Sequence, residues 1–219
     1  EQHGAAVLNY CRCVGLAKDN ERINGVEIHD LENDTQFTVY AKTVINATGV
    51  FVDELRHMDD SQTAPIITAS QGIHIVLPKH FLPGEAAIMI PKTDDGRVLF
   101  AVPWHDQVVV GTTDTPVNSK SLEPRALQAE RDFLMTHAGQ YLTKSPSDSD
   151  VLSIFAGLRP LVQSGDSSDT AALSREHTIL ISNSGLITLT GGKWTTYRKM
   201  AQDVIDQAEK SMGIEPTHC

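Results

Sequence analysis

The chain has 219 residues and carries a formal net charge of −10 at neutral pH. With 40% hydrophobic and 21% charged residues, it has the composition of a soluble globular protein that can bury one large core or two small ones. The acidic balance argues against DNA or RNA as a partner, because Lys and Arg contacts to phosphates supply most of the affinity for nucleic acids. No stretch approaches the roughly 18 apolar residues of a membrane-spanning helix. Three cysteines without a CxxC spacing predict neither a disulfide framework nor a metal site.

The first 60 residues predict three strands followed by a helix. β-branched and other apolar residues recur between polar turns over residues 5–49, which favours strands over a helix. Turns are expected at residues 20–22 and 33–34. The third strand is expected to run directly into Asn46-Ala47-Thr48-Gly49, and residues 50–60 then predict a helix. Because strand-like sequence begins at once, without a signal-peptide pattern, we expect the chain to be a piece of a longer polypeptide.

Residues 65–116 have a different character, because short runs rich in β-branched residues follow one another between turn sequences. The four runs lie at residues 72–78, 86–91, 97–104 and 107–114. Their spacing leaves no room for crossover helices and therefore predicts a mostly antiparallel sheet. A further strand is expected at residues 151–162, between two polar loops.

Two amphipathic helices are expected in the second half of the chain. The first covers residues 123–142, with Pro124 in its first turn. Its apolar face is expected to include Leu127, Phe133, Leu134 and Ala138. The second ends the chain before Gly213, after strands at residues 177–182 and 186–192. Its predicted buried stripe consists of Tyr197, Met200, Ala201, Val204, Ile205 and Ala208.

The order of these elements predicts an interrupted organisation. Residues 1–60 and 175–219 are expected to form one unit, and a β-sheet domain of residues 61–174 is expected to be inserted between them. The predicted fold class is therefore α+β or α/β, with a mostly antiparallel sheet in the insert.

A glycine pair joins the last predicted strand to the last predicted helix, in the sequence Gly191-Gly192-Lys193. A nucleotide-binding P-loop is excluded, because it would need a glycine at position 187 and a Ser or Thr at position 194, where Ile187 and Trp194 stand. A strand–glycine–helix junction is nevertheless a natural place for anionic or polar ligand atoms.

Several stretches, taken in this order, resemble the FAD-dependent glycerol-3-phosphate dehydrogenases, which belong to the D-amino-acid-oxidase-like flavoproteins. They are VINATG at residues 44–49, GIHIVLP at 72–78, VPWHDQVVVGTTDTPV at 102–117, FAGLRPLV at 155–162 and TLTGGKWTTYRKMAQ at 188–202. The resemblance covers essentially the whole chain. It implies that residues 1–60 and 175–219 are parts of a Rossmann-like FAD-binding domain, and that residues 61–174 bind the substrate.

The chain departs from this family in two respects. The GxGxxG fingerprint that places the FAD pyrophosphate on a helix N-terminus does not occur in the sequence. The family usually carries Pro-Trp after the ATG motif, where Val50-Phe51 stands, so no contact is carried over to these two residues. The isolated chain is therefore expected to bind FAD poorly and to be inactive.

The resemblance implies oxidation of sn-glycerol 3-phosphate to dihydroxyacetone phosphate. A hydride leaves C2 for flavin N5, the C2 hydroxyl loses its proton, and the electrons then pass to a quinone. It further implies a cytoplasmic protein, either free or peripheral on the inner membrane face. The sequence leaves the oligomeric state open, with a homodimer as one candidate.

Arg159 is the first candidate for the substrate anchor. Pro160 biases its backbone towards an extended conformation, and a guanidinium can bind phosphate or alkoxide oxygens with two hydrogen bonds. Its apolar neighbours argue against a solvated surface arginine, which is the alternative interpretation. By resemblance, Arg175 is a second phosphate contact, although on its own it would be interpreted as an exposed charge at a strand end.

His74 alternates with Ile73 and Ile75, so it faces away from their side of the strand. A histidine in a strand is more often a hydrogen-bonded structural residue than a catalytic one. The GIHIV match nevertheless makes His74 a candidate for substrate contact or for the general base, because an imidazole with a pKa of about 6.5 suits proton transfer at neutral pH.

By resemblance, Gly191 and Gly192 approach the pyrimidine edge of the flavin, and Gly49 lies close to the cofactor. Lys193 is expected to reach the substrate phosphate or the C2 oxygen. Two further residues, Thr195 and Thr196, are expected to cap the last helix or to bond the flavin. The alternative is a glycine-rich turn with a threonine cap and a solvated lysine, and Gly49 would then simply end a strand.

Two other functions are compatible with the sequence. A related FAD-dependent amine or 2-hydroxy-acid oxidase would bind a carboxylate through the same arginine, but such enzymes commonly show RPxTPDG where this chain has RPLVQSGDSSD at residues 159–169. A non-catalytic β-sheet binding module is the alternative from a different class, and the absence of GxGxxG favours it for the isolated chain.

Overall fold

The computed structural model describes residues 2–91, 93–94, 96–163 and 176–214, and within them the chain forms two compact units. The first unit contains residues 2–67, 162–163 and 176–214, and the second contains residues 68–161. The polypeptide therefore leaves the first unit after Ile67 and re-enters it at Val162.

The first unit begins with an antiparallel meander of three strands, in the order β1-β2-β3. The expected turns are confirmed: Asn20 and Glu21 between β1 and β2, and Asp34 before β3, have the left-handed backbone that tight turns favour. The strands are β1 (Cys11–Asp19), β2 (Arg22–Asp30) and β3 (Thr35–Tyr40).

The third strand does not continue into the ATG motif, contrary to the sequence-based expectation. It ends at Tyr40, and Ile45–Asn46 forms a separate short strand, β4, in another sheet. The physical reason lies in burial. Every residue of β3 is exposed, whereas Asn46 is fully buried and its side-chain amide donates to the backbone oxygen of Val52 at 2.9 Å.

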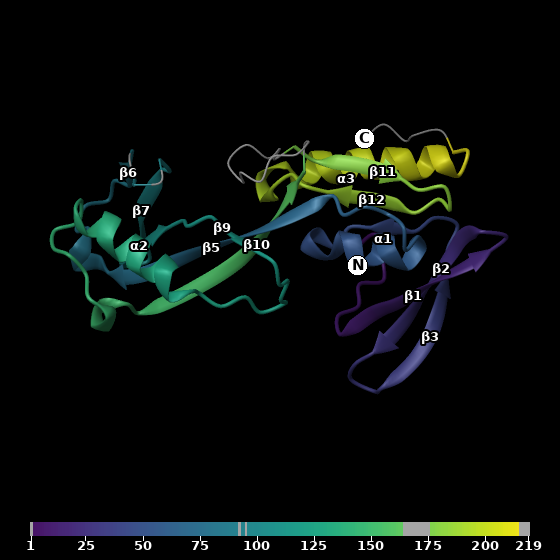
Figure 1. Ribbon diagram of the computed structural model, residues 1–219, viewed down its shortest axis with the longest axis horizontal. Coiled ribbons are helices and arrows are strands. Elements are labelled where there is room, and N and C mark those ends of the chain that lie inside the picture. Colours follow the sequence, from purple (N-terminus) through teal and green to yellow (C-terminus); the bar gives the residue numbers. More distant parts are fainter. Residues whose placement is uncertain (1, 92, 95, 164–175, 215–219) are drawn as a thin grey trace. The chain divides into compact units, whose positions relative to one another are not determined.

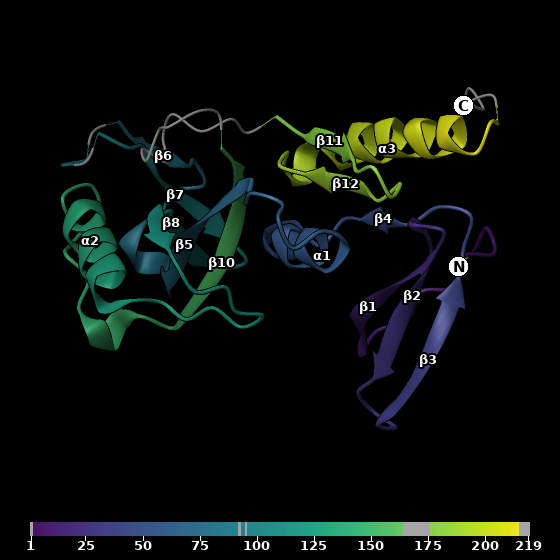
Figure 2. The same ribbon diagram turned by 45° about the vertical axis from the view of Figure 1, so that its right-hand side comes forward.

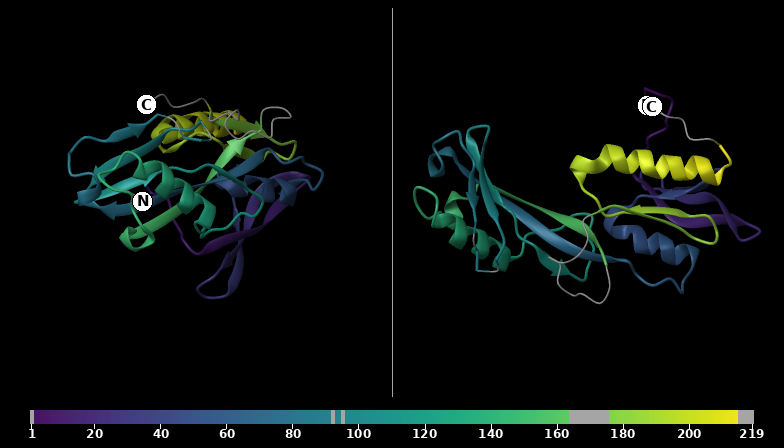
Figure 3. Two further views of the ribbon diagram at one scale, coloured as in Figure 1. Left: turned by 60° about the vertical axis from the view of Figure 1, so that its left-hand side comes forward. Right: turned by 90° about the horizontal axis from the view of Figure 1, so that it is seen from above.

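The second sheet of this unit has the order β11-β12-β4. β12 pairs with β11 in the antiparallel sense and with β4 in the parallel sense. Helices α1 and α3 both contact β12 and lie on opposite sides of it (Figure 3). The elements are β11 (Thr178–Ile181), β12 (Ile187–Thr190), α1 (Val52–Asp59) and α3 (Tyr197–Ser211), with short 3-10 turns η1 (Gly49–Phe51) and η4 (Trp194–Thr196).

The predicted buried stripe of α3 is only partly correct. Val204 and Ala208 are buried against Ile187 and Leu189 of β12, and Met200 packs at the edge of this cluster. Three residues of the predicted stripe are exposed: Tyr197, Ala201 and Ile205. A three-stranded sheet is narrow, so within this unit it covers only half of the apolar face of the helix. No helix in the described part of the chain combines the length and apolar character needed to cross a membrane.

The second unit is built on a sheet with the strand order β10-β5-β8-β7-β6, in which β9 also pairs with β5. Its long strands β5 and β10 run side by side (Figure 1). The pairs β5–β8, β7–β8 and β6–β7 are all antiparallel, which confirms the mostly antiparallel sheet expected from the sequence. The strands are β5 (Ile67–Pro78), β6 (Ile88–Ile90), β7 (Leu99–Trp104), β8 (Gln107–Gly111), β9 (Thr115–Val117) and β10 (Ser153–Val162).

The two faces of this sheet have different roles. One face carries the alternate residues Ile73, Ile75 and Leu77 of β5, and packs against Leu134 and Ala138 of helix α2 (Gln128–Gly139) in a single hydrophobic core (Figure 2). The opposite face, which we call the open face, carries exposed apolar side chains: Met89, Phe100, Val102, Trp104 and Phe155. His74, one residue out of phase with the core residues of β5, faces the same side as Phe155.

Helix α2 starts later than the sequence predicts. It begins at Gln128, and Pro124 and Leu127 lie before it, with Leu127 47% exposed rather than on the buried face. The carboxylate of Glu130 accepts a hydrogen bond from the backbone N–H of Leu127 at 3.0 Å and so closes the first turn from within. This contact fixes the start of the helix.

Candidate functional site

His74 lies in a slot on the open face of the sheet. It pairs with Gly111 of β8, and a Cβ atom at position 111 would overlap the imidazole ring. On its other side the ring of Phe155 stacks on the imidazole, with 5.0 Å between ring centroids and 9° between the planes. Burial, together with the positive charge of Arg159, lowers the pKa of His74 from its ordinary value. The imidazole is therefore neutral at pH 7 and able to accept a proton.

Arg159 of β10 lies on the same face, above Gly72 of β5. A Cβ atom at position 72 would overlap the guanidinium, so the glycine is what allows this position. Nη2 of Arg159 donates to Oγ1 of Thr112 at 2.8 Å, and Nη1 lies 3.7 Å from Oδ1 of Asp114. The Asp114 carboxylate in turn accepts a short hydrogen bond from Ser70.

The second unit thus brings together two of the candidates that the sequence analysis named. A neutral imidazole and a cationic guanidinium lie on one sheet face, and the charge of Arg159 adds to burial in lowering the pKa of His74. This pairing provides a proton acceptor next to a group that binds oxyanions or polarises a hydroxyl.

The first unit brings together the glycine segments. Because β4 and β12 are parallel neighbours, with Ile45 opposite Ile187, their carboxyl ends lie at the same edge of the sheet. Gly49 follows one strand and Gly191 follows the other. Ligands of α/β sheets bind at this edge. The geometry therefore agrees with the expectation that both glycine segments face one cofactor.

The structure gives Gly191 and Gly192 a second reason to be glycine. Both have a positive φ, +75° and +68°. A Cβ at position 191 would overlap the backbone oxygen of Glu176, and one at position 192 would overlap the sulfur of Met200. The positive φ favours glycine at both positions independently of any cofactor. The backbone contact adds to this requirement at Gly191, whereas at Gly192 the flexible side chain of Met200 can move aside. Gly49, at φ +61°, has no atom within 4 Å of an added Cβ.

Lys193 and the threonines that follow it stand at the start of α3. The N–H of Lys193 donates to Oγ1 of Thr196 at 3.1 Å, and this hydroxyl donates to the backbone oxygen of Lys193 at 2.9 Å. Thr196 therefore closes the 3-10 turn η4, and its side chain makes no capping hydrogen bond to helix α3 itself. Its contact with a flavin stays a prediction. Lys193 and Thr195 are exposed. Lys193 belongs to the first unit and Arg159 to the second, whereas Arg175 lies outside the described residues.

The surroundings of His74 and Arg159 were missed by the sequence analysis. Gly72, Gly111 and Phe155 are contact residues in the structure, yet each was interpreted only as part of a strand or of a family stretch. One signal was available: Gly72, His74 and Ser70 alternate along β5 and must share a face. The partners on β8 and β10 could not be found in this way, because they depend on sheet register.

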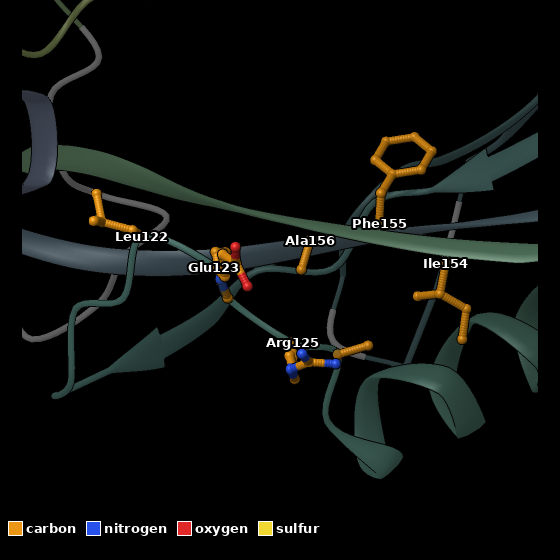
Figure 4. A pocket seen from close by; sticks show the side chains of 8 residues that line it. Leu122, Glu123, Arg125, Ile154, Phe155 and Ala156 are labelled. Carbon is orange, nitrogen blue, oxygen red and sulfur yellow. The ribbon is translucent and has the colours of Figure 1, made fainter. Parts of the chain in front are cut away.

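A groove of about 530 Å³ lies beside this site in the second unit. It is lined by residues 122–126 and 154–156. Phe155, which lines the groove, also stacks on the imidazole of His74. Figure 4 shows Phe155 and Ile154 projecting to opposite sides of β10. Neither His74 nor Arg159 lines the groove.

Comparison with known proteins decides the family. Residues 1–198 match the family described as FAD dependent oxidoreductase. The chain belongs to this family. Among curated members, it is 43% identical over 217 residues to a mitochondrial glycerol-3-phosphate dehydrogenase from Arabidopsis thaliana, with 98% of this chain and 34% of that protein covered. The human mitochondrial glycerol-3-phosphate dehydrogenase is 40% identical over 222 residues, with 98% and 30% covered.

A solved structure agrees with this placement among the FAD dependent oxidoreductases. The glycerol-3-phosphate dehydrogenase from Bacillus halodurans, complexed with FAD, has a TM-score of 0.87 and 33% identity, over 99% of this chain and 41% of that one. An L-alpha-glycerophosphate oxidase from Mycoplasma pneumoniae shares the fold, with a TM-score of 0.63 and 19% identity. The chain spans about a third of the length of the curated relatives it matches.

The residues present fit part of an FAD site. Two glycine segments with left-handed backbone end parallel strands at one sheet edge. Beside them, the hydroxyl of Thr190 is buried, and no residue of the described part of the chain forms a hydrogen bond with it. Such an atom needs a partner, and a ligand or water at the Gly191 turn would supply one. The pyrophosphate would need other residues, because GxGxxG does not occur in the sequence.

Proposed function

We propose that the complete protein containing this chain is an FAD-dependent glycerol-3-phosphate dehydrogenase. In this proposal the second unit binds the substrate, and the first unit contributes residues to the FAD-binding domain. The observation that carries it is the neutral His74 beside Arg159 on one sheet face, in a chain 40–43% identical to glycerol-3-phosphate dehydrogenases.

Each candidate then has a defined task. Arg159 binds an anionic oxygen of sn-glycerol 3-phosphate and holds the C2 hydroxyl towards His74, whose free ring nitrogen accepts the hydroxyl proton. Lys193 and Arg175 supply further positive charge for the phosphate, in a chain whose net charge is −10. When bound, FAD supplies the acceptor for the C2 hydride. Gly49, Gly191, Gly192, Thr195 and Thr196 are proposed to line the cofactor.

The acceptor of the electrons and the location are proposed on the family resemblance alone. A quinone takes the electrons, and the protein works as a homodimer that is peripheral on the cytoplasmic face of a membrane. The related oxidases remain a weaker proposal, because the sequence after Arg159 departs from their usual pattern.

The experiment is an Arg159→Ala substitution in the complete enzyme. We expect kcat/KM for sn-glycerol 3-phosphate to fall at least a hundredfold, because about 3 kcal/mol is a typical loss for a charged hydrogen-bonding partner. The exposed Arg12, on the meander of the first unit, provides the matched control Arg12→Ala. An unchanged kcat/KM in Arg159→Ala would show that the anchor is elsewhere.

A further inference from the structure

The guanidinium of Arg159 is held by the segment that follows β8. Oγ1 of Thr112 accepts from Nη2 of Arg159 at 2.8 Å, and the same hydroxyl donates to the backbone oxygen of Thr113 at 3.1 Å. Because the hydroxyl proton is used in this second bond, a lone pair of Thr112 points to the arginine. Asp114, two residues on, faces Nη1. The segment thus contacts both terminal nitrogens of the guanidinium.

This segment is itself fixed from the other side of the sheet. Oγ1 of Thr113 accepts from the backbone N–H of Ile73 and donates to the buried carboxylate of Glu130, both at 3.0 Å. The side chain of Arg97 donates a short hydrogen bond to the backbone oxygen of Asp114. A segment tied to β5, to α2 and to the loop before β7 is rigid, so the Arg159 guanidinium that it binds is held in one position.

The Arg159 guanidinium lies directly on the backbone of Gly72. The guanidinium occupies the space that a Cβ at this position would need. Gly157, two residues before Arg159 on β10, has no atom within 4 Å of an added Cβ. The need for glycine therefore exists at Gly72, as it does at Gly111, but not at every glycine of this face.

We propose that Thr112 and Gly72 are positioning residues, which fix the plane of the Arg159 guanidinium so that it binds an oxyanion with two parallel hydrogen bonds. A planar fork recognises phosphate or alkoxide oxygens only in a defined orientation. Neither residue needs to touch the substrate. The role of Arg159 itself rests on the proposed function, whereas the fixing of its guanidinium does not.

The first test measures the arginine through its neighbour and needs neither substrate nor cofactor. In the 219-residue chain the pKa of His74, followed by NMR titration, reports the distance of the Arg159 charge. Thr112→Val keeps the shape of the side chain and removes the acceptor, so the arginine moves away and the pKa of His74 rises. Gly72→Ala also raises the pKa of His74, because the added methyl group displaces the Arg159 guanidinium. Thr112→Ser and Gly157→Ala leave the titration at the wild-type position, and Arg159→Ala sets the upper limit of the rise.

The second test uses the complete enzyme. Thr112→Val lowers kcat/KM for sn-glycerol 3-phosphate about tenfold, the loss expected for one hydrogen bond to a charged group, and Thr112→Ser restores it to within about twofold. If Thr112→Val and Gly72→Ala leave both the His74 titration and kcat/KM unchanged, the positioning role is refuted. If the titration responds but the wild-type enzyme does not oxidise sn-glycerol 3-phosphate, the positioning role stands and the proposed function fails.

Discussion

Two glycines of the second unit make room for two charged or titratable side chains. Gly111 leaves the space for the imidazole of His74, and Gly72 leaves the space for the guanidinium of Arg159. Both are in strands, where a glycine normally weakens the sheet. The glycines weaken their strands, but they let a side chain of a neighbouring strand lie flat on the sheet: His74 over Gly111 and Arg159 over Gly72. In the proposed function, this sheet face is the substrate site.

The lowered pKa of His74 predicts a specific dependence of stability on pH. Because burial and Arg159 disfavour the charged imidazole in the folded state, the unfolded chain binds the proton more readily. Stability from this group is present above the ordinary pKa of about 6.5 and is lost as the pH falls towards the lower folded value. We expect His74→Gln to reduce the loss of unfolding free energy between pH 7 and pH 5, measured by urea denaturation. A wild-type slope in His74→Gln would contradict the assigned neutral imidazole.

Residue-level prediction from the sequence succeeded where alternation along one strand carried the information. The out-of-phase position of His74 relative to Ile73 and Ile75 follows from the two-residue period of a strand, and the structure confirms that it leaves the core face. The need for glycine at position 192 was attributed to a flavin. Its packing against Met200, eight residues further on, depends on the angle at which α3 leaves the turn, and no local pattern encodes that angle.

At the scale of elements, Glu130 joins helix α2 to the sheet. Its buried carboxylate accepts from Gln71 at 2.7 Å, from Thr113 at 3.0 Å and from the N–H of Leu127 at 3.0 Å. Burial alone would raise the pKa of Glu130, but these hydrogen bonds hold it below its ordinary value. One side chain therefore caps the helix, anchors β5 and fixes the segment after β8.

Removing this carboxylate should destabilise the second unit strongly. We expect Glu130→Ala to cost about 3 kcal/mol of unfolding free energy, because three buried donors lose an ionised acceptor. The exposed Glu123, in the loop before the same helix, supplies the control Glu123→Ala, for which we expect a change below about 0.5 kcal/mol. Chemical denaturation at pH 7 measures both. Equal midpoints for the two variants would show that Glu130 does not hold the helix.

The same contacts explain which elements the sequence could predict. The strands at 72–78, 97–104 and 107–114 were found because their alternation and turns are local signals, and their antiparallel pairing is confirmed. The start of α2 was placed too early, since the residue that decides it, Glu130, acts through Gln71 and Thr113 on other elements. The buried stripe of α3 was overpredicted for a similar reason. Sequence periodicity identifies the apolar face of the helix, but the width of the sheet that covers it determines how many of these residues are buried.

At the scale of the whole chain, the first unit is assembled from segments far apart in sequence. Asp59, at the end of α1, receives a hydrogen bond from Ser184 at 2.6 Å and an ion pair from Lys18 of β1 at 2.8 Å, and its side chain is only 4% exposed. The meander, the helix and the β11–β12 hairpin thus meet at one carboxylate. Because the second unit has a hydrophobic core of its own, this junction belongs to the first unit alone.

The Asp59 junction predicts that the two units can be destabilised separately. We expect Asp59→Ala to cost the first unit about 2 kcal/mol, because the hydrogen bond from Ser184 and the ion pair with the partly exposed Lys18 are lost together. Hydrogen exchange at single amides is the measurement: protection should fall in β12 and remain at its wild-type level for Val108 and Val110 of β8. Glu32→Ala, at an exposed turn of the meander, is the control. An equal fall of protection in β8 and β12 would mean that the chain unfolds as one cooperative body, in which the sheet of the second unit depends on the first unit for its stability.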